Sequence, residues 1–296
     1  MSQFDILYNK LINKIITEGV SDKEFDVRTR WESDGTPAYT KSIISQQMRF
    51  DNSEVPILTT KMVAWKTAIK EILWVWQKKS NNVQELRDMG VDIWNQWEQE
   101  DGTIGKAYGF QLGKKNRNIT EESSWSMDGE LSGKNLSIKK VDQVDYLLHQ
   151  LKNNPSSRRN ITMLWNPDDL DEMSLTPCVY ETQWYVKQGK LSLEVRARSN
   201  DMALGNPFNV LQYNVLQRMM AQVTGYELGE FIFNIGDCHA YTRHLDSLSE
   251  QIKREVYEAP ELWINPEIKD FYEFTIEDFK LIDYKHGDKI QYEVAI

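Results

Sequence analysis

Residues 179–198, VYETQWYVKQGKLSLEVRAR, predict a β-hairpin. Apolar and polar side chains alternate through 179–187 and again through 190–198, which is the period of a strand with one buried face. The dipeptide Gln188-Gly189 between the two runs fits a two-residue turn. Because strands joined by a tight turn run antiparallel, this segment indicates a sheet that is at least partly antiparallel.

Further strands and helices are predicted on both sides of the hairpin. Strands are expected at 38–50, 160–165 and 227–235, and helices at 3–18, 65–77, 81–89, 141–152, 208–224 and 241–257. Because these elements follow no regular βαβ rhythm, we predict the α/β (α+β) class, a single domain over 1–296 with a large mixed, mostly antiparallel sheet that carries helices. Residues 112–140 are polar and rich in Ser, Lys, Asn and Gly, so we expect a variable polar insertion there.

The composition is that of a globular, acidic protein. The 296 residues include 35 Lys and Arg against 45 Asp and Glu, for a formal charge of −10. This balance argues against general nucleic-acid binding, which depends on neutralising many phosphates. No window reaches the roughly 18 uninterrupted apolar residues of a membrane helix. Cys178 and Cys238 are too few for a disulfide framework, and the N-terminus lacks the pattern of a signal peptide, so we expect a cytoplasmic protein.

The stretch Leu175-Thr176-Pro177-Cys178 presents a thiol at the start of the predicted hairpin. Proline fixes its own φ and restricts the residue before it, so the chain that approaches Cys178 is expected to be extended. A thiol presented at a sheet edge in this way is a candidate nucleophile. The alternative is a small buried hydrophobe, the usual role of a free cysteine, because reactivity requires an electropositive setting.

Residues 196–209, RARSNDMALGNPFN, place two arginines, a hydroxyl, a carboxylate and several amides between the second hairpin strand and the next helix. Arg198 and Ser199 are suited to bind phosphate. The planar guanidinium of Arg198 can donate two parallel hydrogen bonds, and the hydroxyl of Ser199 can donate one. Asn209 offers one donor and one acceptor side by side, which suits the edge of a pyrimidine. The alternative is a loop in which Asp and Asn serve only as turn and helix caps.

Two more segments carry candidate binding residues. Residues 236–241, GDCHAY, bring His239 and Tyr241 to a strand end, where they are suited to hydrogen-bond sugar hydroxyls. Arg158-Arg159 is a cationic pair that, taken alone, is equally well explained as a solvated surface feature. The sequence has no His-x-x-x-His or Cys-x-x-Cys spacing and no glycine-rich phosphate loop. We therefore predict no metal.

Together these segments resemble the thymidylate synthase family. The matching motifs occur in order over most of the chain: SIISQQMRF (42–50), LTTK (58–61), EILW (71–74), IWNQW (93–97), YG (108–109), SRR (157–159), WN (165–166), PC (177–178), RSND (198–201), LGNPFN (204–209), GDCHAY (236–241) and VAI (294–296). The resemblance implies reductive methylation of dUMP to dTMP by 5,10-methylenetetrahydrofolate, which supplies the one-carbon unit and the hydride and leaves as dihydrofolate. It also implies a homodimer in which two large sheets stack back to back.

The resemblance assigns the catalytic roles. Cys178 would add to C6 of the uracil ring and turn C5 into a nucleophile, and Arg198 would favour the thiolate form. Asn209 would hold the uracil edge and stabilise developing charge. Glu71, on the apolar helix 65–77, would move protons at the pyrimidine. The catalytic set also includes Tyr108, linked to proton removal at C5, and Asp201.

Binding roles follow from the same resemblance. The residues expected on dUMP are Arg198, Ser199, Asp201, Asn209, His239 and Tyr241, joined by Arg158 and Arg159 from the partner chain. An N-terminal arginine is also expected at the phosphate; Arg28 is assigned, and Arg30 remains the alternative. The residues expected on the folate are Lys61, Trp94, Asp201, Gly205, Ala295 and Ile296. The last two belong to a tail that closes over the ligands.

Three positions depart from the family pattern. Val179 stands where most relatives have His after the nucleophile, and a Val side chain cannot hydrogen-bond. Ala197 stands where many relatives have a polar amide. The N-terminal loop 27–36, VRTRWESDGT, is lengthened, which is why Arg28 and Arg30 both remain candidates.

Two alternative functions are compatible with parts of this pattern. One is deoxycytidylate hydroxymethylation on the same scaffold, where an Asp replaces the pyrimidine-reading amide because cytosine presents a donor where uracil presents an acceptor; Asn209 favours uracil. The other is a catalytically silent or RNA-binding homologue. The presence of Cys178 and Glu71 argues against a silent protein, and the lack of a broad basic stripe argues against RNA as the main partner.

Overall fold

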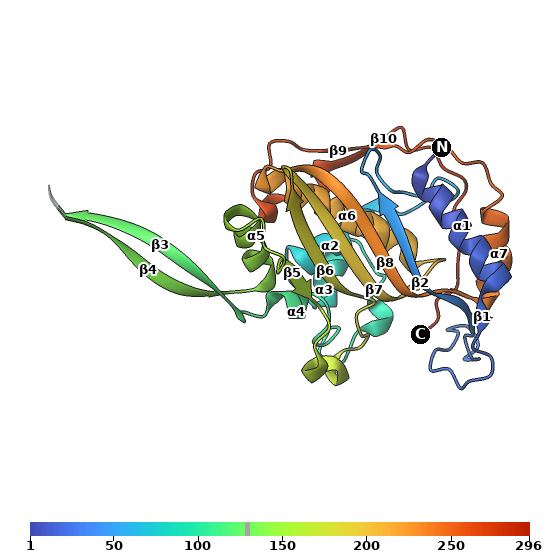
Figure 1. Cartoon of the computed structure of the whole chain (residues 1–296). Helices are drawn as coiled ribbons and strands as arrows, with labels where there is room; N and C mark the ends of the chain where they lie inside the picture. The colour runs from blue at the N-terminus through green and yellow to red at the C-terminus, as the bar shows by residue number, and fades with distance from the viewer. Residues whose placement is uncertain (128–130) are drawn as a thin grey trace.

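A six-stranded mixed sheet forms the centre of the molecule (Figure 1). The computed structural model describes residues 1–127 and 131–296, with the backbone alone for 122–127 and 131–135. The strand order is β1-β2-β8-β7-β6-β5. These strands are β1 (Val20–Ser21), β2 (Thr40–Phe50), β5 (Ile161–Met163), β6 (Val179–Lys187), β7 (Lys190–Asp201) and β8 (Glu227–Tyr241). Two smaller sheets pair β3 (Arg117–Met127) with β4 (Leu131–Val141) and β9 (Glu261–Ile264) with β10 (Phe279–Ile282).

Helices connect and cover these strands. The α-helices are α1 (Gln3–Glu18), α2 (Trp65–Trp76), α3 (Val83–Asp88), α4 (Gly109–Gly113), α5 (Gln143–Asn153), α6 (Gly205–Thr224) and α7 (Leu245–Gln251). Short 3₁₀ turns occupy η1 (Asn95–Trp97), η2 (Pro167–Glu172), η3 (Thr242–His244), η4 (Phe271–Glu273) and η5 (Ile276–Asp278). None of the helices among the described residues combines the length and the apolar character needed to cross a bilayer.

The sheet confirms the predicted hairpin and the predicted fold class. β6 and β7 pair antiparallel from Val179 opposite Ala197 to Lys187 opposite Lys190, on either side of the Gln188-Gly189 turn. β2 with β8, β1 with β2 and β5 with β6 are also antiparallel, whereas β7 and β8 run parallel. The parallel pair is joined by α6, which crosses over one face of the sheet. The result is a mixed, mostly antiparallel sheet.

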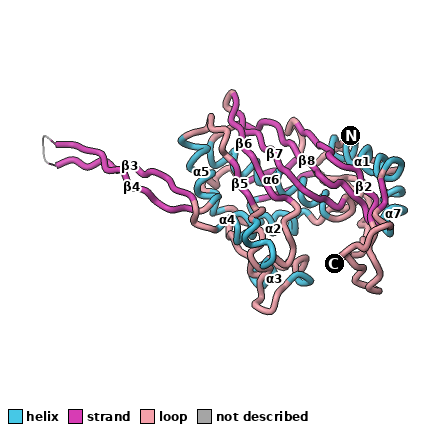
Figure 2. Tube along the Cα trace, turned by 60° about the horizontal axis from the view of Figure 1, so that its bottom comes forward, coloured by secondary structure: helices cyan, strands magenta, loops and turns pink. Residues whose placement is uncertain are grey.

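The core lies between the sheet and the helices α2 and α6, which cover the same face (Figures 1 and 2). Every second residue of β7 and β8 points into it, which is the alternation expected of a half-buried strand. These buried side chains are Leu191, Leu193, Val195, Phe231, Phe233 and Ile235. Helix α2 is buried over most of its circumference, as its composition predicted, and Trp74 and Trp76 are fully covered. This packing holds Glu71 of α2 next to the first turns of α6.

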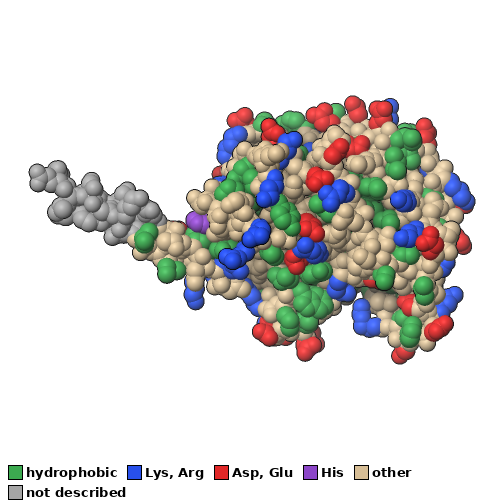
Figure 3. Space-filling view, viewed as in Figure 1, with side chains coloured by type: hydrophobic (Ala, Val, Ile, Leu, Met, Phe, Trp, Pro, Cys, Tyr) green, Lys and Arg blue, Asp and Glu red, His purple; other side chains and the backbone are tan. Residues whose placement is uncertain are grey.

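The opposite face of the sheet is polar and remains partly exposed. Arg196 of β7 forms ion pairs with Glu181 of β6 and with Glu194 (3.1 Å), and Asn234 of β8 donates to Glu194 (2.9 Å). A cavity of about 650 Å³ lies on this face and includes Arg198 in its lining. Acidic and basic side chains are interspersed over the surface seen in Figure 3.

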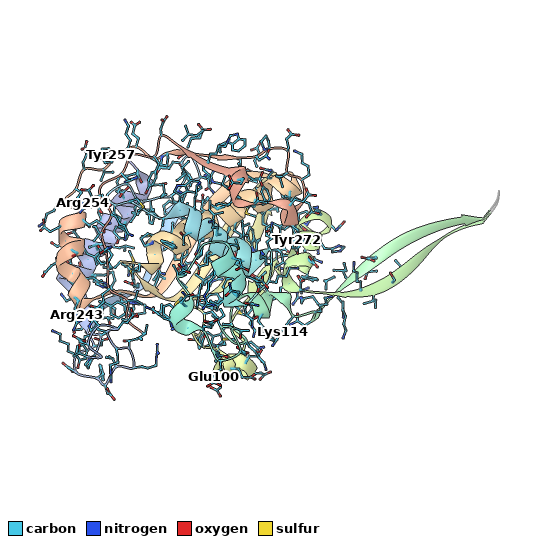
Figure 4. All side chains as sticks on the ribbon, turned by 180° about the vertical axis from the view of Figure 1, so that it is seen from behind. Glu100, Lys114, Arg243, Arg254, Tyr257 and Tyr272 are labelled. Carbon is cyan, nitrogen blue, oxygen red and sulfur yellow. The ribbon has the colours of Figure 1, made fainter. Side chains whose placement is uncertain are left out.

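The predicted polar insertion contains a long hairpin. β3 and β4 pair from Arg117 opposite Val141 outward, and the hairpin projects away from the body (Figure 1). Residues 128–130, which belong to the predicted insertion 112–140, lie outside the described residues. The base of the hairpin lies between α4 and α5, close to Lys114 and Tyr272 in Figure 4.

Two predicted elements have boundaries that differ from the structure by more than three residues. β8 continues to Tyr241 instead of ending at 235, because residues 237–241 pair with β2 and residues 237–239 pair with β7 as well. Gly236 allows this pairing, since a Cβ there would lie 2.6 Å from the carbonyl oxygen of Arg198. The helix predicted over 241–257 is shorter and consists of the turn η3 followed by α7. The longer strand carries His239 and Tyr241 within the sheet.

Candidate active site

A cavity of about 550 Å³ opens between α2, the start of β6 and the first turns of α6. Six residues singled out from the sequence line it: Glu71, Trp94, Tyr108, Cys178, Gly205 and Asn209. Its walls also include apolar side chains: Ile72, Val75, Ile93, Trp97, Leu175 and Phe208. The fold therefore brings a thiol, a phenol, a carboxyl and an amide from distant parts of the chain to one largely apolar pocket.

Cys178 immediately precedes β6 and faces this cavity. Its backbone N–H donates to the hydroxyl of Tyr108 (3.2 Å), and its carbonyl accepts from the N–H of Arg198 (2.8 Å). Burial raises the pKa of the Cys178 thiol, while the charge of Arg198 and the hydroxyl of Tyr108 act in the opposite direction. Cys238 is instead fully buried in the core, and burial raises its pKa to about 12. Of the two cysteines, Cys178 is the one that lines the cavity.

Tyr108 sits at a sharp turn in the chain. Its φ is +43°, a value that non-glycine residues rarely adopt, and α4 begins at the next residue. The ring packs edge-on against Trp94, with centroids 5.3 Å apart. Burial raises the pKa of Tyr108 well above its ordinary value, so the hydroxyl is protonated at neutral pH. Backbone strain of this kind persists where the surroundings hold it, and it is frequent at functional sites.

Glu71 projects from α2 into the same cavity. One carboxyl oxygen accepts from the indole N–H of Trp94 (2.7 Å), and the other accepts from the side-chain amide of Gln212 (2.5 Å). Burial raises the pKa of Glu71, and these two hydrogen bonds lower it. A raised pKa makes a carboxyl better suited to proton exchange than an exposed one.

Asn209 lies on the first turns of α6 at the edge of the cavity. Its side-chain oxygen accepts from Asn200 (2.9 Å), and its side-chain nitrogen donates to Gln212 (3.1 Å). Gln212 in turn donates to Glu71, so the amide and the carboxyl are connected through one side chain.

Arg198 and Ser199 follow one another on β7. The Arg198 guanidinium donates through Nε to the carbonyl of Pro177 (3.0 Å) and through Nη2 to the carbonyl (3.0 Å) and hydroxyl (2.8 Å) of Thr176. Among the described residues, its Nη1 has no hydrogen-bond partner. Ser199 is half-buried and pairs in register with Asp237 of β8. The cation is thus fixed beside Cys178 with one donor group still available.

Asp201 caps the turn that leads into α6. Its two oxygens accept from the backbone N–H groups of Ala203 (2.9 Å) and Leu204 (3.2 Å), which is the capping role considered as the alternative for this loop. Its charge also raises the pKa of His239 and opposes the effect of burial on Lys61. Lys61 is buried, which lowers its pKa to about 8, and its Nζ donates to the carbonyl of Ala203 (2.5 Å).

His239 and Tyr241 lie near the end of β8 with their rings 5.5 Å apart. Burial alone would lower the pKa of His239, but Asp237 at 3.1 Å and the charge of Asp201 outweigh it, so the pKa is raised. Burial raises the pKa of Tyr241 to about 12, and the charge of the exposed Arg28 acts in the opposite direction. Arg28 is therefore close enough to Tyr241 to influence it.

Arg30 has different surroundings from Arg28. Its guanidinium donates to the carbonyls of Val27 and Thr29 and forms an ion pair with Asp26 (3.3 Å). These contacts hold the side chain within its own loop.

The C-terminal tail is bound to the N-terminal loop. The backbone of Ile296 exchanges two hydrogen bonds with that of Arg30 (2.7 and 2.9 Å), and Ala295 forms a β-bridge with Trp31. Val294, just before them, lines the cavity. Arg243 joins the two segments, because it forms ion pairs with Asp34 (2.6 Å) and Glu293 (3.1 Å). Figure 4 shows Arg243 at the end of the molecule away from the hairpin.

Arg158 and Arg159 lie apart from the other predicted residues. They are exposed on the loop between α5 and β5 and do not line the cavity. This exposure leaves both side chains available for contact with another subunit.

The two apolar departures from the family pattern are direct neighbours. Val179 and Ala197 are paired across β6 and β7, and both are buried. Val179 also lines the cavity next to Cys178.

Several residues of the site were missed by sequence reasoning, among them two amides and one residue of the C-terminal tail. Gln212 contacts Glu71 and Asn209, Asn200 contacts Asn209, and Val294 lines the cavity. The signal available for the first two was the unusual number of amides between 200 and 212, which capping alone explained only in part. Within residues 1–127 and 131–296, no group of three or more His, Cys, Asp or Glu side chains is arranged to hold a metal ion.

Comparisons with known proteins agree with one another. A family model described as thymidylate synthase matches residues 6–296. The chain is 75% identical to the thymidylate synthase of Bacillus phage phi3T and 75% identical to thymidylate synthase 1 of Bacillus subtilis (strain 168), in both cases over 296 residues and the full length of each protein. A solved structure, thermostable thymidylate synthase A from Bacillus subtilis, superimposes with a TM-score of 0.89 at 74% identity and covers 99% of both chains.

Proposed function

The chain belongs to the thymidylate synthase family, and on this premise we propose which of its residues perform the reaction. The enzyme is a methyltransferase that converts dUMP to dTMP with a folate cosubstrate. One observation supports the assignment of residues most directly. The Cys178 thiol, the Tyr108 hydroxyl, the Glu71 carboxyl and the Asn209 amide meet at a single cavity.

Cys178 is the proposed nucleophile. Its sulfur forms a bond to C6 of the uracil ring, and the electron pair of the C5–C6 double bond moves toward O4, which makes C5 nucleophilic. The thiolate is the reactive form, and burial makes it scarce in the free site. Arg198 favours the thiolate because its charge lowers the thiol pKa. When the reaction ends, the same sulfur leaves C6 and the double bond is restored.

Asn209 is proposed to recognise the uracil edge. Uracil presents a donor at N3 and an acceptor at O4, and a carboxamide matches both with its oxygen and its nitrogen. The nitrogen also stabilises the negative charge that develops on O4 when sulfur adds to C6.

Glu71 and Tyr108 are proposed to handle protons at the pyrimidine. The raised pKa of Glu71 and its position in the cavity support a role in proton transfer near O4. We propose that Tyr108 acts on the proton at C5, and the support is its hydroxyl, which lies 3.2 Å from the backbone nitrogen of Cys178. Its hydroxyl is neutral at physiological pH and acts as a donor and acceptor within a hydrogen-bonded path.

The phosphate and ribose are proposed to bind beyond Cys178. Arg198 offers its free Nη1, Ser199 offers a hydroxyl, and His239 and Tyr241 contact the ribose hydroxyls. Arg28 is the better candidate for the N-terminal phosphate contact. Its charge lowers the pKa of Tyr241, whereas the guanidinium of Arg30 is bound to residues of its own loop. Arg158 and Arg159 of the partner subunit complete the cationic site.

The folate is proposed to lie against the apolar wall of the cavity. Trp94 offers an aromatic face, and an ionised Asp201 can accept from the N–H groups of the pterin ring, so these residues fit the cosubstrate. Gly205 lines the cavity, and a Cβ there would be in ordinary van der Waals contact with Asn200 (3.6 Å) and Asn209 (3.7 Å). Lys61, Ala295 and Ile296 complete this side and exclude water. When bound, 5,10-methylenetetrahydrofolate supplies the one-carbon unit and the hydride; no metal takes part in this proposal.

The assembly is proposed to be a cytoplasmic homodimer. The family resemblance implies that a second copy stacks on the partly exposed face of the sheet, which carries the cavity of about 650 Å³. Stacking would place the loop with Arg158 and Arg159 near the other subunit.

Substitution of Cys178 tests the proposed chemistry. We expect Cys178→Ala to lower the release of tritium from [5-³H]dUMP below detection while dUMP binding, followed by calorimetry, is retained. Cys238→Ala is the matched control and keeps turnover, since its side chain lies in the core. Near-normal turnover in Cys178→Ala would remove this thiol from the mechanism. Faster tritium release from dCMP than from dUMP in the unmodified enzyme would contradict the assignment of Asn209 to uracil.

A further inference from the structure

Four amide side chains form a continuous hydrogen-bonded chain that ends at Glu71. Asn206 donates to Asn200 (2.7 Å), Asn200 donates to Asn209 (2.9 Å), Asn209 donates to Gln212 (3.1 Å), and Gln212 donates to Glu71 (2.5 Å). Asn200 is at the end of β7, and the other three amides are on the first turns of α6. Asn200 and Asn206 are fully buried, whereas Asn209 reaches the cavity.

The direction of the chain is determined at the Glu71 end. The Gln212 nitrogen faces Glu71 and also the backbone carbonyl of Ala68 (3.2 Å), and that carbonyl is only able to accept. The Gln212 oxygen must therefore face Asn209. This orients the Asn209 nitrogen toward Gln212 and its oxygen toward Asn200, which must donate.

The far end of the chain shows that it does not serve stability alone. Among the residues that the structure describes, the buried side-chain oxygen of Asn206 has no hydrogen-bond partner, and its nitrogen contacts the sulfur of Met48 (4.0 Å) in addition to Asn200. An unsatisfied buried acceptor is costly, and replacing both amides by apolar residues of similar shape would avoid that cost. Asn206 instead holds the Asn200 oxygen, so that the Asn200 nitrogen stays directed at Asn209.

We propose that Asn200 and Asn206 are positioning residues that set the preference for uracil over cytosine by fixing the rotation of the Asn209 amide. This inference rests on the proposed role of Asn209 in reading the base. Uracil needs an acceptor opposite N3 and a donor opposite O4, whereas cytosine needs these two groups exchanged. An Asn209 amide turned by 180° would suit cytosine. In that orientation its nitrogen would face the nitrogen of Asn200, and its oxygen would face the oxygen of Gln212.

The isosteric variant Asn200→Asp reverses one link of the chain. A carboxylate accepts from Asn209 instead of donating to it, and so it favours the turned amide. We expect the ratio of kcat/KM for dUMP to kcat/KM for dCMP, measured by tritium release from the two 5-tritiated nucleotides, to fall about tenfold, the effect of one reversed polar contact. Asn214→Asp is the control. Asn214 is an equally buried amide of α6, but it binds Asn52 and Arg218 and takes no part in the row of amides that ends at Glu71. The ratio of kcat/KM values is expected to stay unchanged in this variant.

A second variant covers the case in which a buried carboxylate prevents folding. Asn206→Leu keeps the side-chain shape and removes the donor that holds Asn200, and we expect a fall in the same ratio of about threefold, corresponding to one lost neutral hydrogen bond. Equal losses for both nucleotides in the Asn200 and Asn206 variants would overturn the proposal, since that is the signature of a structural role.

The reference variant Asn209→Asp separates two kinds of failure. If it shifts the ratio toward dCMP and the Asn200 and Asn206 variants do not, Asn209 reads the base and the positioning role is wrong. If Asn209→Asp leaves the ratio unchanged, the proposed role of Asn209 itself fails, and the positioning role fails with it.

Discussion

Val179 and Ala197 illustrate how single residues in this site depend on one another. Each occupies a position where the family pattern predicts a polar side chain, and the two face each other across β6 and β7. Replacing only one member of a polar pair would leave the other buried without a partner, at a cost of about 1–3 kcal/mol. Replacing both members leaves no such orphan. The wall behind Cys178 is therefore apolar, and hydrogen bonding in the site is concentrated on Glu71, Gln212 and Asn209.

Glu71 leads to a prediction about pH. Because burial raises its pKa, folding favours the protonated carboxyl, so its contribution to stability is complete below the pKa of the unfolded chain and is lost as pH rises through the folded value. Glu71→Gln removes this loss. We expect the free energy of unfolding of the variant, relative to the unmodified enzyme, to increase between pH 4 and pH 8 by about 1.4 kcal/mol per unit of pKa shift, in urea titrations.

The same substitution should lower kcat by about 10²- to 10⁴-fold, the usual contribution of a general acid–base group. Parallel stability curves for Glu71→Gln and the unmodified enzyme would show that the carboxyl is not perturbed by folding. Glu85, on the half-buried face of α3 away from the cavity, provides a control for the loss of one carboxylate.

The residues of the site differ in how well they could be predicted from sequence. Cys178 is marked by the preceding proline, and Arg198, Ser199 and Asn209 by their dense cluster of polar letters. Asn200 and Gln212 could not be distinguished from ordinary turn and capping residues by sequence. Their roles depend on contacts between β7, α6 and α2, which lie far apart in the sequence. The bond between Ile296 and Arg30 is likewise a contact between the two ends of the sequence.

At the level of elements, the sequence was sufficient to predict those helices and strands whose ends are determined by neighbouring residues. The helix over 3–18 begins after Ser2, whose hydroxyl accepts from the N–H of Asp5 (3.3 Å), as an N-cap should. The β6–β7 hairpin was also predicted with its turn. The length of β8 was not, because its last residues look like a turn and become a strand only through pairing with two neighbours.

The contact between the N-terminal loop and the tail leads to a second prediction. Arg243 binds Asp34 and Glu293 and also donates to Thr36 (2.8 Å), so it holds both segments over the cavity. We expect Arg243→Ala to raise the KM for the folate about 2- to 10-fold, within the modest range of exposed ion pairs, while dUMP binding changes little. The effect should shrink in 1 M salt, because exposed charges are screened.

A matched surface pair checks that this effect is local. Glu250 of α7 and Lys253, just after this helix, form an exposed ion pair (2.7 Å). Lys253→Ala is expected to leave the KM for the folate and the binding of dUMP unchanged. Equal KM values for Arg243→Ala and the unmodified enzyme at low salt would show that the tail is held without this arginine.

At the scale of the whole molecule, the proposed dimer predicts that inactive variants can restore one another. A mixed dimer of Cys178→Ala and Arg158→Ala chains contains one site with both an intact thiol and an intact partner arginine. With random exchange of subunits, half of the dimers are mixed, so we expect activity at about a quarter of the sites. Recovery is measured by tritium release after unfolding and refolding the two variants together.

The control for this experiment is each variant refolded alone, which should remain as inactive as before mixing. If mass spectrometry shows mixed dimers but no activity returns, the site is not shared between subunits and Arg158 acts, if at all, within its own chain. The same mixture made with Arg28→Ala in place of Arg158→Ala should not recover, because that arginine serves the site of its own chain.

The β3–β4 hairpin gives the molecule a place where its length can change freely. Arg117 and Val141 are paired at its base, so the chain leaves and re-enters the body at adjacent positions. The distance between α4 and α5 is then independent of how many residues lie between them. The entropic cost of closing a longer loop also grows only slowly with loop length. A foreign epitope or a small folded module inserted between Arg117 and Val141 would therefore lie outside the catalytic body, and the geometry of the pocket would be left intact.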